Sequence, residues 1–314
     1  MTDKQIEKKR VAVVMSTYNG ERYIEEQIES ILKQTGVDVF LYIRDDGSKD
    51  GTIPILKKYE TLDQVSVTYG ENVGIGMSFM SVLLSLTDDY DAYAFSDQDD
   101  IWAEDKLACA LSFLNREEGC VLYASNLERV DADNHSQGLI FDKGQSFDHS
   151  LLFTICSSKC YGCTQVFSRE LFQLVKERRV SEEMLRLRLH DTWISVSAAA
   201  AGKIIFDPNA HIRYRRHGDN YTSFDQGKAV LWKQRFHKLF HAKEQRPRSK
   251  MALEVIRRYP EYVEKNPDKE LILALAHPLT LRNRVFLIRN RKRFIAPPYE
   301  SDFLYIIKAV AGWI

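Results

Sequence analysis

Residues 11–48, VAVVMSTYNGERYIEEQIESILKQTGVDVFLYIRDDGS, decide the fold of this chain. The stretch begins with the apolar run VAVVMS, continues with the amphipathic segment YIEEQIESILKQ, and returns to a second β-rich run, VFLYIRDD. Amphipathic spacing is typical of a helix, whereas short runs rich in Val and Ile are typical of strands. The order predicts a strand, a helix and a strand, which is the βαβ unit of a parallel sheet.

The same alternation continues to residue 100. TIPILKKYE and MSFMSVLLSL are the next expected helices, and VSVTYG and YAFSDQDD are the next expected strands. We therefore predict an α/β fold with a parallel, doubly wound sheet, in which ligands bind at the carboxyl ends of the strands. Polar groups follow three strands directly, at residues 16–19, 45–47 and 97–100. We expect these three loops to converge on one crevice.

Beyond residue 106 the pattern is less regular. Residues 106–114 are predicted to form a helix, and another helix is expected from His190 to Gly202, whose position suits a C-cap. Candidate strands are residues 120–125, 164–167, 203–206 and 212–214. From about residue 224 onward the sequence is basic, aromatic and helical in pattern. We expect two domains, residues 1–224 and residues 225–314.

The charge of the chain is balanced overall but unevenly distributed. The 314 residues include 44 Lys and Arg and 44 Asp and Glu, which argues against a dedicated nucleic-acid-binding protein. Residues 221–314 contain 19 basic and 9 acidic residues, a net charge of +10, so residues 1–220 carry −10. No run of 18 apolar residues and no signal-peptide core is present, so we expect a cytoplasmic protein.

The five cysteines are an odd number in a chain large enough to fold without disulfides, which favours reduced thiols. Cys156, Cys160 and Cys163 lie close together, as zinc ligands often do, but no CxxC pair is repeated. We interpret them as buried structural thiols.

Two common phosphate-binding motifs are missing from the sequence. Neither GxGxxG after the first strand nor GxxxxGK[ST] occurs, so we expect the crevice to bind its ligand in another way. The glycines of residues 70–76 have the spacing of a weak Gly-rich loop, and we interpret them as the turn that enters a helix.

Acidic residues gather at the ends of two predicted strands. Asp97, Asp99 and Asp100 would repel one another unless a cation joined them, and oxygen ligands alone favour Mg²⁺ or Mn²⁺. A solvated acidic turn is the alternative. Asp45 and Asp46 at the neighbouring strand end favour the metal, because an acidic crevice binds an anionic diphosphate only through a divalent cation.

Seven short motifs in sequence carry a resemblance: STYNGERY, IRDDGSKDGT, ENVGIG, FSDQDDIW, YGCTQVF, HDTW and YRRHGDN. In this order they resemble the family 2 glycosyltransferases of the GT-A fold, whose sheet is Rossmann-like and mixed. The SDQDDIW form and the late HD and RH pairs are most similar to bacterial rhamnosyltransferases of cell-wall polysaccharide and O-antigen assembly. The matches span residues 11 to about 223, and seven ordered motifs are far more specific than any one alone.

The resemblance implies a role for each matching residue. The nucleotide and donor sugar would be bound by Thr17, Tyr18, Asn19, Asp45, Asp46, Asp97 and Arg216. The metal would be held by Asp99, Asp97 and His217. The sugar and acceptor pocket would contain Trp102, Gly162, Cys163, Thr164 and His190, and Asp191 would be the catalytic base.

Four of these residues have a plain structural alternative: Asp191 as a helix N-cap, and Tyr18, Trp102 and His217 as ordinary packed or surface side chains. Alternation along RYRR puts Arg215 and Arg216 on opposite faces of a strand, so at most one of them points inward.

By this resemblance the protein is expected to be an inverting, metal-dependent glycosyltransferase that uses Mn²⁺ or Mg²⁺ as cofactor. The expected donor is dTDP-rhamnose and the expected acceptor a saccharide or lipid-linked saccharide. A UDP-hexose is the alternative donor, because thymine and uracil present the same N3–H to Asp46. Two other classes are weighed: a non-catalytic nucleotide-binding partner subunit, disfavoured by the intact motifs, and a nucleotidyltransferase, disfavoured by the lack of a basic Gly-rich phosphate loop.

A lipid-linked acceptor would place the protein at the inner face of the cell membrane. The basic and aromatic residues 225–314 are expected either to pack on the catalytic domain or to contact anionic lipid peripherally. The main basic cluster consists of Arg289, Arg291, Lys292 and Arg293. A homo-oligomer is also compatible with the sequence.

Overall fold

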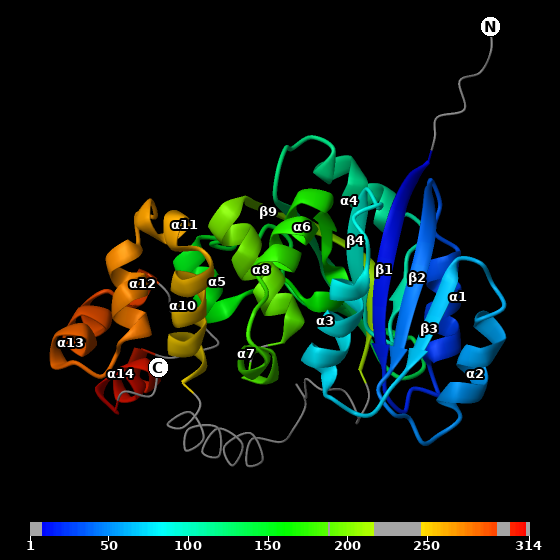
Figure 1. Cartoon of the computed structure of the whole chain (residues 1–314), viewed down its shortest axis with the longest axis horizontal. Coiled ribbons are helices and arrows are strands. Elements are labelled where there is room, and N and C mark those ends of the chain that lie inside the picture. The colour runs from blue at the N-terminus through cyan, green and yellow to red at the C-terminus, as the bar shows by residue number, and fades with distance from the viewer. Residues whose placement is uncertain (1–7, 188, 217–245, 294–301, 312–314) are drawn as a thin grey trace, which may run out of the picture. The chain divides into compact units, whose positions relative to one another are not determined.

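The computed structural model of the chain describes residues 8–187, 189–216, 246–293 and 302–311. Two compact units are present (Figure 1). The first contains residues 1–146, 160–177 and 202–216, and the second contains residues 147–159, 178–201 and 217–314. The domain boundary expected at residue 224 falls within residues 217–245, outside the described ranges.

One nine-stranded sheet forms the centre of the first unit. Its strands are β1 (Lys9–Thr17), β2 (Val37–Asp45), β3 (Val65–Tyr69), β4 (Ala92–Ser96), β5 (Ile101–Trp102), β6 (Val121–Val130), β7 (Ser136–Leu139), β8 (Val166–Ser168) and β9 (Lys203–Arg215). The order is β3-β2-β1-β4-β8-β6-β9-β5, and β7 pairs with β6. The predicted parallel arrangement of β1 to β4 is confirmed. Because β8 runs antiparallel to β4 and β6, the whole sheet is mixed.

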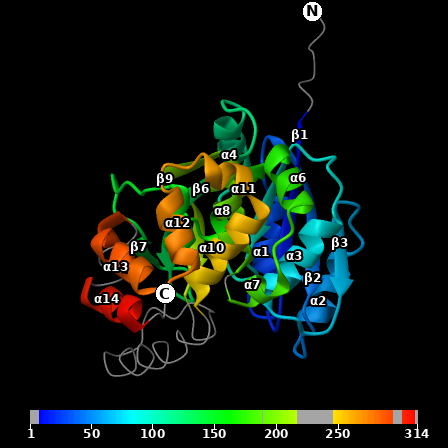
Figure 2. The ribbon, with the colours of Figure 1, turned by 60° about the vertical axis from the view of Figure 1, so that its left-hand side comes forward.

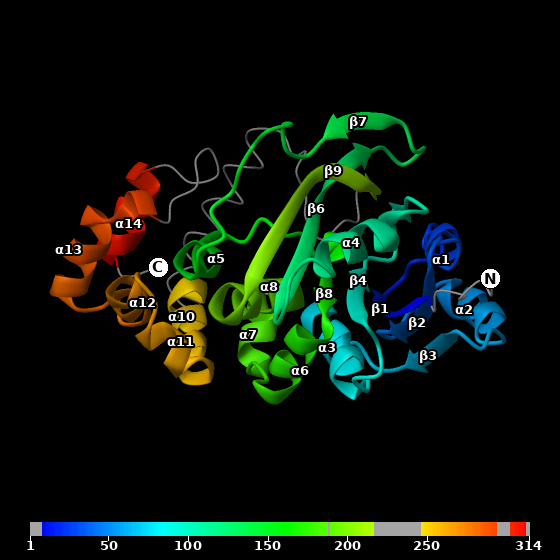
Figure 3. The same ribbon diagram turned by 90° about the horizontal axis from the view of Figure 1, so that it is seen from above.

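Helices cover both faces of this sheet (Figure 3). They are α1 (Ile24–Leu32), α2 (Thr52–Tyr59), α3 (Ile75–Ser85), α4 (Lys106–Leu114) and α6 (Arg169–Glu177). On one face, alternate residues of β1 such as Val13 pack in a core with Ile28 of α1 and Leu107 of α4. On the other face the ring of Tyr93 stacks on Phe172 of α6, with centroids 3.9 Å apart. Burial on both faces explains the continuous apolar runs of the parallel strands.

The structure corrects one prediction at β9 and gives a reason for the glycine that precedes this strand. Residues 203–206 and 212–214 belong to one strand instead of two. Pro208 lacks an N–H group, but the register with β6 shifts beside it, and this irregularity lets the pairing continue past the proline. Gly202 directly follows α8, at the predicted position, and a Cβ atom there would lie 1.7 Å from the Cys120 carbonyl oxygen, so the close approach of the two backbones requires glycine.

The second unit is helical in its described residues, as predicted for the C-terminal region (Figure 2). Its helices are α5 (Leu151–Ser157), α7 (Glu182–Leu187), α8 (His190–Ala201), α10 (Pro247–Arg258), α11 (Pro260–Glu264), α12 (Lys269–Ala276), α13 (Leu281–Arg289) and α14 (Asp302–Ala311). Tyr259, fully buried between α10 and α11, places its ring 5.6 Å from that of Trp193 and donates a hydrogen bond to Ser197 at 2.8 Å. The C-terminal helices therefore share a core with α8.

Candidate active site

Gln98 links the loop after β1 to the loop after β4. Its Oε1 accepts hydrogen bonds from the Thr17 hydroxyl at 2.6 Å and the Tyr18 N–H at 2.9 Å, and its Nε2 donates to the Tyr18 carbonyl at 3.2 Å. The loop after β2 joins through Asn19, whose N–H donates to Ser48 Oγ at 2.9 Å. The predicted convergence of the three strand-end loops is confirmed.

Backbone conformation and close packing explain which residues occur at positions 19 and 20. This residue has φ of 50°, a left-handed conformation that asparagine tolerates better than most residues. A Cβ atom on Gly20 would lie 2.5 Å from Gln98 Oε1, so any larger residue would displace the Gln98 amide. Thr17 is 1% exposed, whereas Tyr18 is 44% exposed and presents its ring to solvent at the strand ends.

Asp45 and Asp46 are buried and hold the loops in place. Asp45 Oδ1 accepts hydrogen bonds from the N–H groups of Gly47 at 3.1 Å and Ser48 at 2.9 Å, which closes the turn after β2. The Asp46 carboxylate accepts from the N–H groups of Val73 at 2.9 Å and Gly74 at 3.0 Å, and it pairs with Arg44.

Asp46 thereby anchors the glycine-containing segment that precedes α3. Gly74 is the N-cap of this helix, with φ of 89°, so the prediction that residues 70–76 form a helix-entry turn is confirmed.

Asp97 and Asp99 lie half-buried at the end of β4, and Asp100 is fully buried. Asp100 Oδ1 accepts from the Arg215 N–H at 3.2 Å, while its Oδ2 has no hydrogen-bond partner within the described residues. Burial, together with the charges of Asp99 and Asp97, holds the pKa of the Asp100 carboxyl well above its usual range. Close carboxylates with a buried unpaired oxygen are a donor set that suits a hard divalent cation.

Lys106, which sequence reasoning missed, lies behind this acidic loop. It is fully buried, its Nζ is 3.3 Å from the centroid of the Trp102 ring, and burial lowers its pKa to about 7. The only sequence signal was a lysine on the apolar face of a predicted helix. Trp102 is 3% exposed and belongs to the core, which fits the packing alternative for this residue.

Arg215, at the end of β9, is buried, and Arg216 is half-buried. The Arg215 guanidinium donates to the Asp99 carbonyl at 3.1 Å and to Glu26 Oε2 at 2.6 Å, so it braces the acidic loop. His217 lies outside the described residues.

The YGCT segment forms a short 3-10 turn over Gly162–Thr164. Cys163 is 1% exposed and Thr164 is fully buried. The Cys163 Sγ atom lies within 4.8 Å of a carboxylate oxygen of Asp97 and of one of Asp100. The five cysteines are free, and Cys156, Cys160 and Cys163 are buried, as predicted.

His190 and Asp191 open helix α8 in the second unit. His190 is 3% exposed, and burial lowers its pKa to about 3. Asp191 is half-buried and lies inside the first turn, not at the N-cap, with its Oδ1 accepting from the Thr192 N–H at 2.7 Å. The carboxylate is thus placed at the positive end of a helix.

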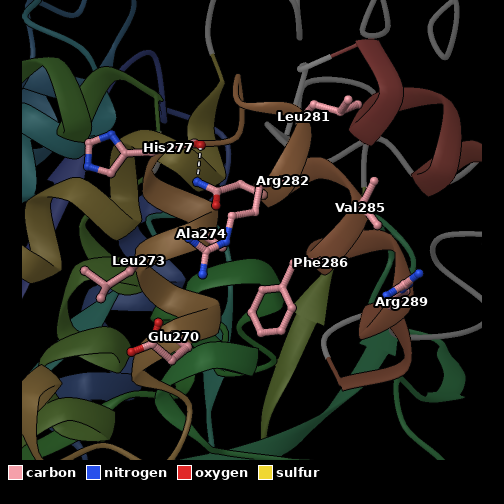
Figure 4. A pocket seen from close by; sticks show the side chains of 10 residues that line it. Glu270, Leu273, Ala274, His277, Leu281, Arg282, Val285, Phe286 and Arg289 are labelled. Carbon is pink, nitrogen blue, oxygen red and sulfur yellow. Dashed lines mark hydrogen bonds between the residues drawn. The ribbon is translucent and has the colours of Figure 1, made fainter.

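The second unit also carries a pocket of about 890 Å³ beside α12 and α13 (Figure 4). Its walls combine the apolar side chains of Leu281, Val285 and Phe286 with Arg282 and Arg289. Leu281 is 77% exposed, so α13 presents apolar and cationic groups together. Among the described helices, none has the length and apolarity needed to cross a membrane.

The comparisons with known proteins agree with one another. The sequence matches the family described as Glycosyl transferase family 2 over residues 12–175. The dTDP-rhamnosyl transferase RfbG of Shigella flexneri is 31% identical over 216 residues, which cover 66% of this chain and 72% of that relative.

Two solved structures share the fold at low sequence identity. S. aureus TarS 1–349 in complex with UDP-GlcNAc has a TM-score of 0.57 at 19% identity, covering 84% of this chain and 70% of that chain. The mannosyltransferase PcManGT from Pyrobaculum calidifontis, in complex with GDP-Man and Mn²⁺, has a TM-score of 0.50 at 17% identity, covering 96% of this chain and 86% of that chain.

Proposed function

The chain belongs to glycosyl transferase family 2 and has the GT-A fold, and we propose that it transfers L-rhamnose from dTDP-rhamnose to a lipid-linked saccharide, with inversion, in bacterial surface polysaccharide synthesis. The observation that carries the proposal is the acidic loop Asp97 to Asp100, hydrogen-bonded through Gln98 to the loop after β1. Rhamnose is favoured by the similarity to a dTDP-rhamnosyl transferase.

Asp99 and Asp97 are the proposed ligands of a Mn²⁺ or Mg²⁺ ion, with His217 as a third. When bound, such an ion neutralises the charge that develops on the leaving diphosphate. Two features of this chain support the assignment: the donors are carboxylate oxygens, and Arg215 braces the backbone of Asp99 from behind. The similar mannosyltransferase structure contains Mn²⁺.

The nucleotide is proposed to bind over the loops after β1 and β2. The exposed ring of Tyr18 is available to stack on a base. Asp46 is the proposed acceptor for the pyrimidine N3–H, because three hydrogen bonds to its carboxylate leave one of about four acceptor positions. Arg216 is proposed to contact the diphosphate.

Asp191 is the proposed catalytic base. A carboxylate with an ordinary pKa cannot ionise an alcohol beforehand, so it would take the acceptor proton as the oxygen attacks the anomeric carbon. Asp191→Asn keeps the shape of the side chain but cannot accept that proton. We expect the rate of transfer to fall by more than tenfold, which corresponds to an increase of more than about 1.4 kcal/mol in the activation free energy. Donor binding should be retained in a calorimetric titration.

A panel of nucleotide sugars tests the proposal as a whole. The full-length protein, with Mn²⁺ or Mg²⁺, is incubated with dTDP-rhamnose, UDP-GlcNAc and UDP-glucose while hydrolysis and the melting temperature are followed. We expect dTDP-rhamnose to stabilise the protein most, and Asp99→Ala to lose this effect. Stronger stabilisation by a UDP-hexose would make that sugar the donor in place of rhamnose. Stabilisation without any turnover would favour the non-catalytic nucleotide-binding subunit, and no response to any sugar would contradict both.

We further propose that α13 contacts the anionic surface of the membrane that holds the acceptor. Leu281, Val285 and Phe286 are exposed, and Arg289 and Lys292 are exposed beside them. Exposed apolar side chains next to cations are typical of helices that lie in a membrane interface. Arg293 serves differently, because it pairs with the buried Asp268 at 2.7 Å.

A further inference from the structure

Three metal-ligand side chains of different chemistry meet in the first unit, apart from the acidic loop. Cys109 lies on α4, and Asp207 and His211 lie on β9. A thiol sulfur, a carboxylate oxygen and an imidazole nitrogen from these residues lie within 4.8 Å of one another. Neither the family resemblance nor the proposed transfer reaction uses any of the three.

The spacing of these atoms is close to the spacing around a tetrahedral metal ion. His211 Nε2 is 3.4 Å and Cys109 Sγ is 3.6 Å from the same oxygen, Asp207 Oδ2. With Zn–N and Zn–O distances of about 2.0 Å and a Zn–S distance of about 2.3 Å, the N–O and S–O edges of a tetrahedron are about 3.3 Å and about 3.5 Å. These two edges differ from the tetrahedral values by about 0.1 Å, and the third, between the sulfur and an imidazole nitrogen, is within 4.8 Å.

The ligands are held in this orientation by other groups. Asp207 is 1% exposed, and its Oδ1 accepts hydrogen bonds from the N–H and the Nδ2 of Asn209, both at 2.9 Å. Its Oδ2 faces the cluster and also accepts a hydrogen bond from the Tyr123 hydroxyl at 2.9 Å, which fixes the carboxylate and leaves it further acceptor positions. His211 Nδ1 lies 3.2 Å from Asp105 Oδ1. A carboxylate behind the other ring nitrogen is the usual support of a histidine that ligates a metal.

His211 Nε2 is buried and faces Asp207 Oδ2 at 3.4 Å, in an ion-pair contact whose geometry falls short of a well-directed hydrogen bond. Sulfur and nitrogen donors favour a transition metal over the hard cation that suits Asp99 and Asp97. We propose that Cys109, Asp207 and His211 bind Zn²⁺ or a similar transition-metal ion, with Asp105 as a positioning residue. The ion would tie α4 to β9.

Cobalt is the probe, because it occupies zinc sites and reports its ligands by absorption. The full-length protein is freed of metal with a chelator and titrated with Co²⁺. We expect intense visible bands of a tetrahedral ion and a near-ultraviolet thiolate band, both displaced by Zn²⁺. Cys109→Ser should lose the thiolate band, whereas Cys120→Ser, a half-buried cysteine outside the cluster, should keep it.

Two further variants test whether the ion binds at this cluster and not elsewhere in the first unit. Cys163→Ser should keep the thiolate band, because that thiol neighbours Asp97 instead. Asp105→Asn, at a side chain 66% exposed, should fold normally and bind Co²⁺ about 10 to 100 times more weakly. The proposal is overturned by the absence of a thiolate band in the wild type, by its survival in Cys109→Ser, by its loss in Cys163→Ser, or by unchanged affinity in Asp105→Asn. None of these readouts depends on sugar transfer.

Discussion

At the scale of single residues, the candidate site depends on a side chain that is not itself acidic. Gln98 sits between Asp97 and Asp99, and its amide supplies two acceptor contacts and one donor contact to the loop after β1. A carboxylate at this position would lose the donor contact, and a shorter side chain would not reach. The glutamine therefore fixes the position of the acidic loop after β4 relative to the loop after β1.

We expect Gln98→Ala to weaken donor binding and to lower stability. The Thr17 hydroxyl is buried and would lose its acceptor, which costs about 1–3 kcal/mol. The Michaelis constant for the donor should rise about tenfold, and the melting temperature should fall, in steady-state assays and thermal scans. Gln173→Ala, which removes an exposed hydrogen bond to Asp88, is the matched control and should change neither. If Gln98→Ala has the wild-type Michaelis constant and melting temperature, Gln98 does not bridge the two loops.

Because His190 is buried, we expect the protein to lose stability at acidic pH. Its pKa is about 3 in the folded state and 6.5 in the unfolded state, so the unfolded chain binds more protons between these values. Stability should therefore fall as the pH drops from about 6.5 towards 3, by at most about 1.4 kcal/mol per pH unit. Thermal scans of the wild type and of His190→Leu at pH 7.5 and 5 measure the difference.

We expect the pH dependence to be flatter in His190→Leu than in the wild type. His135→Leu, at a side chain 78% exposed, is the control and should keep the wild-type slope. Equal slopes in all three proteins would mean that His190 is not the group that titrates.

At the scale of elements, the residues around α13 divide into groups that serve different purposes. Leu287 is fully buried and holds the helix on its unit, whereas Leu281 is exposed. Asn283 donates a hydrogen bond to the His277 carbonyl at 2.7 Å, which fixes the turn that leads into the helix. The exposed apolar side chains therefore belong to a helix that is firmly held on its unit.

We expect Leu281→Ser and the double variant Arg289→Ala with Lys292→Ala to reduce binding to anionic vesicles without changing stability. Each cation near an anionic surface contributes about 1 kcal/mol, so the double variant should bind about 30 times more weakly at low salt. Co-sedimentation at low and high salt measures this. Leu62→Ser, at an exposed leucine of the first unit, is the control. If wild-type protein stays in solution at low salt, α13 has another partner.

Arg293 should respond in the opposite way from Arg289. Arg293 pairs with the carboxylate of Asp268, whose side chain is only 6% exposed. Arg293→Ala should therefore lower the melting temperature and leave vesicle binding nearly unchanged. This separates a structural cation from the proposed lipid-facing cations within one segment of chain.

At the scale of the whole molecule, the C-terminal region is part of the unit that carries Asp191. Glu254 of α10 accepts a hydrogen bond from the Ser181 N–H at 2.8 Å, and Arg178 pairs with Glu261 at 2.6 Å. Together with the packing of Tyr259 on Trp193, these contacts make α8 dependent on residues that follow it by more than fifty positions.

We expect a chain cut after residue 224 to be unstable, because the buried surface around Trp193 would be exposed. Tyr259→Ala should cost about 3–5 kcal/mol in denaturant unfolding, and Tyr259→Phe only about 1 kcal/mol, since it loses one hydrogen bond. Tyr262→Ala, at a half-buried ring on the same segment, should cost less than Tyr259→Ala. A truncated chain as stable as the full one would show that residues 1–224 fold independently.

Much of the first unit could be predicted from local sequence. Burial of parallel strands on both faces leaves an apolar run, and amphipathic helices leave a periodic pattern, so the elements up to residue 100 and the convergence of their loops follow from the residues themselves. The motifs also identified the family, because their order along the chain can be recognised without a structure.

Only the tertiary structure decided which polar residues are buried and what they contact. Gln98 and the group Cys109, Asp207 and His211 carry no local signal, because their partners come from elements that are distant in sequence. Lys106 carried only the weak signal of a lysine on the apolar face of a predicted helix, although the ring of Trp102 that it contacts lies four residues away. The same holds for the single strand β9 and for the requirement for Gly202, which depend on the backbone of β6 and Cys120. Sequence periodicity records how much of each element faces the core, whereas hydrogen-bond partners and ligand sets depend on which elements the fold brings together.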